Sequence, residues 1–270
     1  MTQLTAPPGH TVPVEVGGMA VLLRTSDPDF ARMLQDRYAG FVNCSVPPVF
    51  EFDVDLAAPT GVDPDADVRV RWEQGQWSFR RGDFHADWDP GCGRGRIRQS
   101  ANPYSVDAVL RIVHTIVLAK EGGFLLHSAS AVRGGRAFLF SGVSGAGKTT
   151  ISRLAPPGVT LLTDEVSYVR RQREGYRAFG TPFAGELARV GANVSAPIAA
   201  VYLLAQGPEN HIDPLSKREA MQLLLRNILF FAEDPSLVRR VFDAATEFVA
   251  TVPVRRLTFS PDQRVWELIR

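Results

Sequence analysis

The sequence predicts an α/β protein in two parts, an N-terminal α+β domain over residues 1–100 and a C-terminal α/β domain over residues 101–270. The first observation behind this prediction is a glycine-rich loop at residues 142–149, which lies between an apolar run and a short helical stretch. The second is a series of strand-like runs between residues 68 and 88, separated by turn residues. A chain of 270 residues has room for two modest domains.

The composition is that of an ordinary soluble globular protein, with 45% hydrophobic and 22% charged residues. The net charge of +1 gives no electrostatic reason to expect nucleic acid or an anionic membrane as a partner. Two cysteines, Cys44 and Cys92, suit a reducing cytosol better than a disulfide framework. No apolar stretch has the length of a membrane span, and the N-terminus lacks the pattern of a secretion signal. We therefore predict a cytoplasmic protein without a nucleic-acid or membrane partner.

The sequence of the N-terminal part predicts a hairpin, a helix and a set of strands. Residues 14–24 form the hairpin, and Asp27 is the expected N-cap of a helix that runs to about residue 38. Residues 49–55 alternate apolar with acidic residues, which is typical of a half-buried strand with a solvated acidic face. The remaining predicted segments are antiparallel strands over 68–72, 76–80 and 84–88, and a basic flexible loop over 91–98.

The segment before the glycine-rich loop predicts a helix that leads into a strand. Apolar residues recur at helical spacing between residues 105 and 120, and Ser105 can cap this helix. The strand, over residues 122–132, consists of apolar and small residues and contains His127. A histidine in such a strand is more often a core residue than a catalytic one, so composition alone favours a structural role for His127.

The glycine-rich loop fits the phosphate-loop pattern G-x-x-x-x-G-K-[ST] at every fixed position. Its glycines let successive backbone N–H groups point at phosphate oxygens, and the following helix adds its positive dipole end. Lys148 is expected to reach the β- and γ-phosphates, and the Thr149 hydroxyl to bind Mg²⁺. The loop therefore predicts an ATP site that contains Gly142, Ser144, Gly145, Ala146, Gly147, Lys148, Thr149 and Thr150.

Two adjacent carboxylates, Asp164 and Glu165, follow an apolar run at residues 159–162. One of them can hold Mg²⁺ and the other can accept a proton from an attacking hydroxyl. Adjacent residues of an extended strand point to opposite faces, so we expect only one of the two to face the phosphates directly. The alternative is a solvated acidic pair at the end of a strand.

The remainder of the chain alternates strands with helices. The loop over residues 180–196 carries Glu186 and Arg189, and Arg189 is either a group that stabilises the transferring phosphoryl charge or an exposed loop arginine. The other predicted elements are a hairpin over 166–179, strands over 198–205, 252–259 and 265–269, and helices over 216–231 and 236–249, the first with a Ser216–Glu219 capping box.

The spacing of these motifs resembles the catalytic core of HPr kinase/phosphorylase and its related proteins. The resemblance rests on Leu125-Leu126-His127, on the phosphate loop that follows, and on the run that ends in Asp164-Glu165. It covers about residues 100–270, where weaker matches occur at 102–105, 180–186 and 253–259.

The resemblance implies a mixed-sheet fold like that of phosphoenolpyruvate carboxykinase and an ATP-dependent kinase that phosphorylates a serine hydroxyl. The implied catalytic residues are His127, Lys148, Asp164 and Glu165, and the implied Mg²⁺ ligands are Thr149, Asp164 and Glu186. The chain departs from the family in two places: the second acidic residue is Glu165 rather than aspartate, and Glu186 is only a substitute for the family's magnesium glutamate. HPr itself is therefore poorly supported as the substrate, and the acceptor is a peptide, a protein or a small molecule. A homo-oligomer is left open.

Two alternatives to a kinase remain at this point. One is an ordinary phosphate-loop NTPase, whose acidic residues orient water rather than an alcohol. The other is a nucleotide-binding sensor with little catalysis. Strand order distinguishes the first of these, because a core of parallel strands favours the NTPase and a mixed sheet favours the kinase fold.

Overall fold

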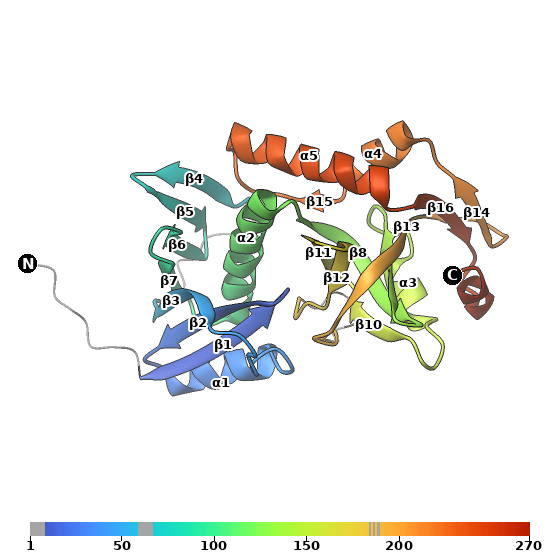
Figure 1. The fold of residues 1–270 in the computed structure, drawn as a ribbon. Helices are drawn as coiled ribbons and strands as arrows, with labels where there is room; N and C mark the ends of the chain where they lie inside the picture. The colour runs from blue at the N-terminus through green and yellow to red at the C-terminus, as the bar shows by residue number, and fades with distance from the viewer. Residues whose placement is uncertain (1–8, 59–66, 184, 186, 188–189) are drawn as a thin grey trace, which may run out of the picture. The chain divides into compact units, whose positions relative to one another are not determined.

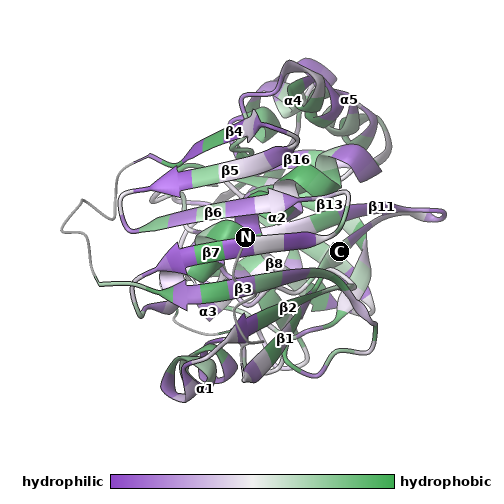
Figure 2. Ribbon diagram, turned by 90° about the vertical axis from the view of Figure 1, so that its left-hand side faces the viewer, coloured by the Kyte–Doolittle hydropathy of each residue, from purple (hydrophilic) through white to green (hydrophobic). Residues whose placement is uncertain are grey.

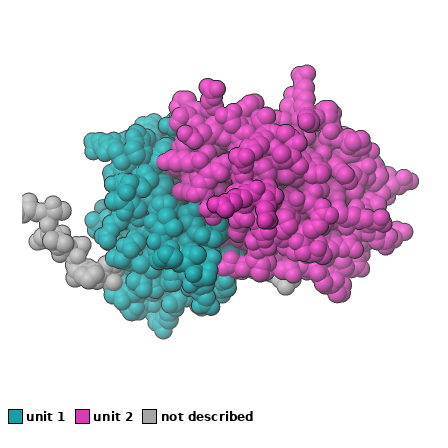
Figure 3. Space-filling model, in the orientation of Figure 1, with its two compact units in different colours: residues 1–113, 231–234 teal, residues 114–230, 235–270 magenta. Residues whose placement is uncertain are grey.

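The computed structural model describes residues 9–58, 67–183, 185, 187 and 190–270 (Figure 1). Glu186, a predicted Mg²⁺ ligand, and Arg189, for which a phosphoryl-stabilising role and an exposed loop position were both open, lie outside the described residues. The chain divides into two compact units, one of residues 1–113 and 231–234 and the other of residues 114–230 and 235–270 (Figure 3). The chain passes from the first unit to the second within helix α2 (Pro103–Glu121). The predicted domain boundary near residue 100 stays a prediction.

The described residues of the first unit form a seven-stranded mixed sheet in the order β1-β2-β3-β7-β6-β5-β4. Its strands are β1 (His10–Val16), β2 (Met19–Thr25), β3 (Pro48–Leu56), β4 (Arg69–Glu73), β5 (Gln76–Arg81), β6 (Phe84–Asp89) and β7 (Arg94–Gln99). Helix α1 (Pro28–Arg37) begins after Asp27, whose carboxylate accepts hydrogen bonds from the N–H groups of Asp29 and Phe30. The predicted hairpin, N-cap and antiparallel strands of this unit are confirmed.

The prediction of a flexible basic loop over residues 91–98 is wrong, because β7 is an interior strand of this sheet. Arginines alternate along it with a glycine and the buried Ile97, an alternation that Figure 2 shows as hydrophilic and hydrophobic residues along the strand. Arg96 forms an ion pair with Asp55 on β3, and Arg94 lies 3.5 Å from Glu51 on the same strand. The acidic face of β3 and the basic face of β7 thus stabilise each other across the sheet.

The described residues of the second unit form a nine-stranded mixed sheet in the order β10-β8-β11-β12-β13-β16-β14, with β9 and β15 joined at its sides. Its strands are β8 (Phe124–Arg133), β9 (Arg136–Ser141), β10 (Thr160–Thr163), β11 (Val166–Gln172), β12 (Gly175–Phe179), β13 (Ser195–Gln206), β14 (His211–Pro214), β15 (Ile228–Leu229) and β16 (Val254–Phe259). The helices are α3 (Lys148–Arg153), α4 (Lys217–Leu225), α5 (Pro235–Thr251) and the 3₁₀ helix η1 (Gln263–Glu267). The predicted α/β class is confirmed.

Strands β8, β9, β13, β12 and β11 form a closed ring, since each pairs with the next and β11 pairs with β8. Strand β9 is antiparallel to β8 and parallel to β13, so the sheet around the phosphate loop is mixed. Alternate residues of β9 enter two cores. Leu139 packs in the core that includes α4 and α5, and Phe140 packs in the core that includes Ile151 and Trp266. Burial on both faces explains why this strand is an unbroken apolar run.

Three local predictions in this part of the chain need correction. Helix α2 is capped by Asn102 rather than Ser105, because the Asn102 side chain accepts hydrogen bonds from the N–H groups of Tyr104 and Ser105. Helix α4 has the predicted capping box but ends at Leu225, since residues 228–229 pair with β8 instead. Residues 263–267 form a 3₁₀ helix rather than a strand, and the Trp266 ring is buried with its Nε1–H donating to the carbonyl of Ile151 at 3.1 Å.

No helix among the described residues is long and apolar enough to cross a membrane. The cytoplasmic location stays a prediction.

Acid is expected to destabilise the second unit through His114, which is fully buried on α2. Burial, helped by the charge of Arg170, lowers the pKa of His114 to about 4 from the ordinary 6.5. Between these two pH values the unfolded chain binds a proton that the folded chain does not, so the free energy of unfolding falls as the pH drops from 6.5 towards 4 and is highest above 6.5. The loss attributable to His114 is at most about 3 kcal/mol.

The measurement is urea unfolding at pH 7, 5.5 and 4.5 for the wild type and for His114→Phe, which keeps the edge-to-face ring contact with Tyr168. The variant loses the hydrogen bond between His114 Nδ1 and Tyr168 Oη at 3.3 Å, so we expect it to be slightly less stable at pH 7. Its stability should then fall less steeply with acid than that of the wild type. Equal slopes for both proteins would contradict the assignment to His114.

Candidate functional site

The phosphate loop connects the end of β9 to the start of α3, as the sequence predicted. Two of its glycines are required by local geometry. Gly147 has a φ of 107°, in the left-handed region, and a Cβ there would lie 2.7 Å from Cζ of Phe259. A Cβ on Gly142 would lie 2.7 Å from Cβ of Ala146, on the opposite side of the loop. The loop is therefore tight because both positions lack side chains.

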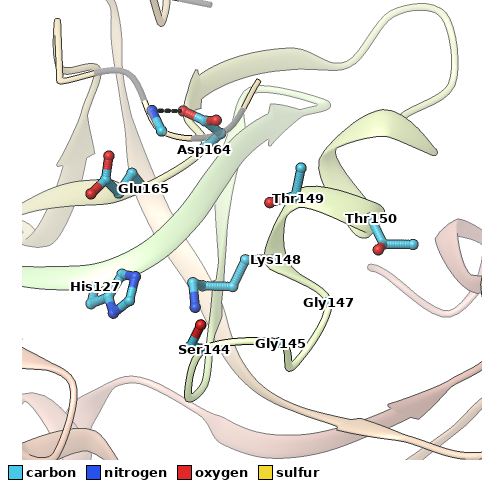
Figure 4. Close-up of a pocket in the computed structure, with 10 residues that line it drawn as sticks. His127, Ser144, Gly145, Gly147, Lys148, Thr149, Thr150, Asp164 and Glu165 are labelled. Carbon is cyan, nitrogen blue, oxygen red and sulfur yellow. Dashed lines mark hydrogen bonds between the residues drawn. The ribbon is translucent and has the colours of Figure 1, made fainter. Parts of the chain in front are cut away.

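Lys148 lies inside the loop and is 8% exposed. Its Nζ donates hydrogen bonds to the carbonyl oxygens of Gly142 at 2.9 Å and Val143 at 3.2 Å. Figure 4 shows the ammonium group beside Ser144, with Thr149 and Thr150 on the turn of helix that follows. The loop thus positions a cation between its own backbone and the cavity that it faces.

The two carboxylates lie in the bend between β10 and β11 rather than on an extended strand. The Thr163 hydroxyl shapes this bend by accepting hydrogen bonds from the N–H groups of Glu165 and Val166, both at 3.2 Å. Asp164 and Glu165 line the same cavity, and the expectation that only one of them faces the phosphates directly stays a prediction. Residues in a bend are free of the strict alternation that holds along a strand.

Asp164 is held firmly by its surroundings. It is 6% exposed, and its two oxygens accept hydrogen bonds from the N–H groups of Gly185 and Leu187, both at 2.9 Å. Glu165 is half-buried and has a longer side chain. The pair therefore combines one carboxylate of fixed orientation with one of greater reach.

His127 reaches the same cavity from β8, and Figure 4 shows its ring on the side of Lys148 and Glu165. In the pairing of β8 with β11, His127 lies opposite Val166, the first residue of β11. The side of β8 at His127 is therefore next to the acidic bend. The neighbouring backbone is held by hydrogen bonds from His127 N–H to the Asn227 carbonyl at 2.7 Å and from Ser128 N–H to the Glu165 carbonyl at 2.9 Å. Composition favoured a structural role for His127 in the core, but the structure places it half-buried at the cavity.

These groups share one cavity of about 420 Å³, although they come from separate segments of the chain. The cavity is lined by His127, Ser144, Gly145, Gly147, Lys148, Thr149, Thr150, Asp164, Glu165 and Gly185. Gly142 and Ala146, predicted as binding residues, do not line it and instead shape the loop behind it.

Sequence reasoning missed two residues of this site. Gly185 lies against the acidic pair, where a Cβ would be 3.0 Å from both Asp164 Oδ2 and Glu165 Cβ. Its signal was present, since it belongs to the stretch 180–186 that resembles the kinase family. Gln206, at the end of β13, donates from Nε2 to the Gly145 carbonyl at 2.6 Å and had no local signal.

The oxygen atoms of the cavity fit a magnesium ion that is also bound to phosphate. Asp164 offers a carboxylate and Thr149 a hydroxyl, and oxygen ligands of this kind are those that Mg²⁺ prefers. Among the described residues, no group of three or more His, Cys, Asp and Glu side chains forms a metal site by itself. Protein ligands in small number, completed by phosphate oxygens and water, are typical of magnesium in phosphoryl-transfer sites.

Comparison with known families finds a match over residues 99–270, to the family described as SynChlorMet cassette protein ScmC. The match covers well over half of the chain and includes every residue that lines the cavity. No curated protein matches this chain.

Proposed function

The chain belongs to the family of SynChlorMet cassette protein ScmC, and we propose that it is an ATP-dependent kinase that transfers the γ-phosphoryl group to a hydroxyl. The observation that carries the proposal is the meeting of His127, Lys148 and the Asp164–Glu165 pair in one cavity at the phosphate loop. A cation, a histidine and two carboxylates around a phosphate site can supply the charge stabilisation, the metal ligand and the base that phosphoryl transfer to an alcohol uses. The resemblance to HPr kinase/phosphorylase, and the phosphoenolpyruvate-carboxykinase-like fold that it implies, belong to this proposal.

Within the proposal, the loop backbone and Lys148 bind the triphosphate. The Lys148 ammonium, now bonded to loop carbonyls, lies within reach of the β- and γ-phosphates and offsets their charge as the transferring group develops it. Magnesium, held by Thr149 and Asp164, would supply further positive charge to the phosphate oxygens.

The rigidity of Asp164 and the reach of Glu165 suggest different roles for the two carboxylates. Asp164, oriented by two backbone N–H groups, suits a metal ligand of fixed position. Glu165 then accepts the proton of the acceptor hydroxyl while the oxygen of that hydroxyl forms a bond to the γ-phosphorus. The bond from that phosphorus to the bridging oxygen breaks, and the electron pair leaves on ADP. His127, on the same side, stabilises the phosphoryl oxygens during the transfer.

The strand arrangement supports the kinase over an ordinary phosphate-loop NTPase. The strand that feeds the loop is antiparallel to β8 on one side and parallel to β13 on the other, so the loop does not stand in a core of parallel strands only. The acceptor remains a serine or another alcohol on a peptide, a protein or a small molecule.

The test is to incubate the protein with Mg-ATP, with and without a pool of cell peptides and metabolites, and to follow ADP. We expect ADP to form in proportion to a new phosphomonoester, and only when the pool is present. Equal ADP formation without the pool would favour the NTPase. ATP binding without any ADP in the presence of a full cell extract would favour the sensor.

A further inference from the structure

A second cavity, of about 530 Å³, adjoins the phosphate loop and is not used by the chemistry described above. It is lined by Gly147, Thr150, Gln206, Gly207, Pro208, Phe259, Ser260 and Pro261. We propose that this cavity binds the adenine base of ATP. The inference rests on the proposed function, because it takes the phosphates of the same nucleotide to lie over the loop.

The topology explains why these segments meet. Strands β9, β13 and β16 are parallel neighbours, with Leu203 opposite Ser141 and Gln206 opposite Phe259. Their carboxyl ends therefore lie at one edge of the sheet, where the phosphate loop follows β9, residues 207–208 follow β13 and residues 260–261 follow β16. The crevice outside the carboxyl ends of parallel strands is where nucleotides bind in open α/β sheets.

The position of the cavity along the loop matches the order of groups in ATP. It shares Gly147 and Thr150 with the catalytic cavity, and Asp164 and Glu165 line the catalytic cavity but not this one. Figure 4 shows Thr150 on one side of the loop and the carboxylates with His127 on the other. If the γ-phosphate lies at the carboxylates, the α-phosphate and the nucleoside extend past Thr150 into the second cavity.

The two cavities also differ in charge as the two ends of ATP do. The catalytic cavity is lined by Lys148, His127 and two carboxylates, which suits a magnesium triphosphate. None of the described residues that line the second cavity carries a charge. Prolines, glycines and the buried ring of Phe259 line it together with the polar, uncharged residues Thr150, Gln206 and Ser260, a mixture that suits a flat heteroaromatic ring with polar edges.

Gln206 connects the two cavities. Its Nε2 donates to the Gly145 carbonyl of the loop at 2.6 Å, while its side chain lines the base cavity. The amide carries both a donor and an acceptor group, so it can reach the polar edge of a base while it holds the loop. Loop geometry and base recognition thus depend on one side chain.

The first experiment separates the base from the phosphates by comparing dissociation constants for Mg-ATP and Mg-tripolyphosphate. Ser260→Trp fills the second cavity with a bulky ring, and Glu209→Trp places the same ring on a nearby exposed residue outside the cavity. We expect Ser260→Trp to weaken ATP binding at least tenfold and to change tripolyphosphate binding less than twofold. Glu209→Trp should change neither. An equal effect of Ser260→Trp on both ligands, or on neither, would overturn the base site.

The second experiment uses the wild-type chain and does not depend on a variant that folds. Photolabelling with 8-azido-ATP in the presence of Mg²⁺, followed by peptide mapping, should place the label in residues 206–208 or 259–261. Label confined to other segments would overturn the base site even where ATP turnover is intact. If the wild type binds neither ATP nor tripolyphosphate, the proposed kinase function fails and the base site fails with it. Equal affinity for the two ligands would overturn the base site alone.

Discussion

Lys148→Met is expected to reduce phosphoryl transfer by about a hundredfold or more, the range seen when one charge-stabilising donor is removed from a reaction site. The variant keeps the length and apolar stem of the side chain but loses the ammonium that lies in the loop. ATP affinity should fall as well, because the proposed function places the same cation at the β- and γ-phosphates. Steady-state ADP release and ATP titration measure the two effects separately.

Lys217→Met is the matched control, since Lys217 is an exposed residue of α4 and does not line the cavity. It should leave both turnover and ATP affinity unchanged. The Lys148 variant also loses two hydrogen bonds to loop carbonyls, which is expected to lower the free energy of unfolding by about 1–2 kcal/mol. A Lys148→Met protein that is folded and turns over ATP at the wild-type rate would place the reaction elsewhere on the chain.

Asp164→Asn and Glu165→Gln are expected to stop the reaction in two different ways. In Asp164→Asn, an amide NH₂ replaces one oxygen that now accepts an N–H bond from Gly185 or Leu187, and the negative charge is lost. We expect a fall in turnover of about a hundredfold or more and a rise in the Mg²⁺ concentration needed for half-maximal rate. In Glu165→Gln, turnover should fall while the Mg²⁺ requirement and ATP affinity stay close to those of the wild type.

The two variants are each other's control, because both neutralise a carboxylate that lines the same cavity. Turnover is measured at several Mg²⁺ concentrations, and ATP affinity is measured by titration. If Glu165→Gln raised the Mg²⁺ requirement and Asp164→Asn did not, Glu165 would be the metal ligand and Asp164 the proton acceptor. If nucleotide binding and turnover were unchanged in both variants, the result would contradict the proposed kinase activity and support a nucleotide-binding sensor.

The local elements of the chain were largely predictable, because their signals are short in range. The side chain of Asp27 caps α1, and the Ser216–Glu219 box caps α4, as their spacing predicted. Two of the wrong predictions were decided by a partner distant in sequence. The arginines of β7 face the acidic residues of β3, and residues 228–229 leave the predicted helix to pair with β8.

By itself the sequence determined the phosphate loop, since Gly142 and Lys148 contact residues of the same loop and Gly147 adopts the positive φ that its turn requires. It also determined which residue types stand near that loop, but not how they face it. Only the tertiary structure brought Asp164, Glu165 and His127 together in one cavity. It also placed the ends of β13 and β16 beside each other at the phosphate loop. The physical reason is that pairing between strands far apart in sequence sets the direction of these side chains, and no local pattern encodes that pairing.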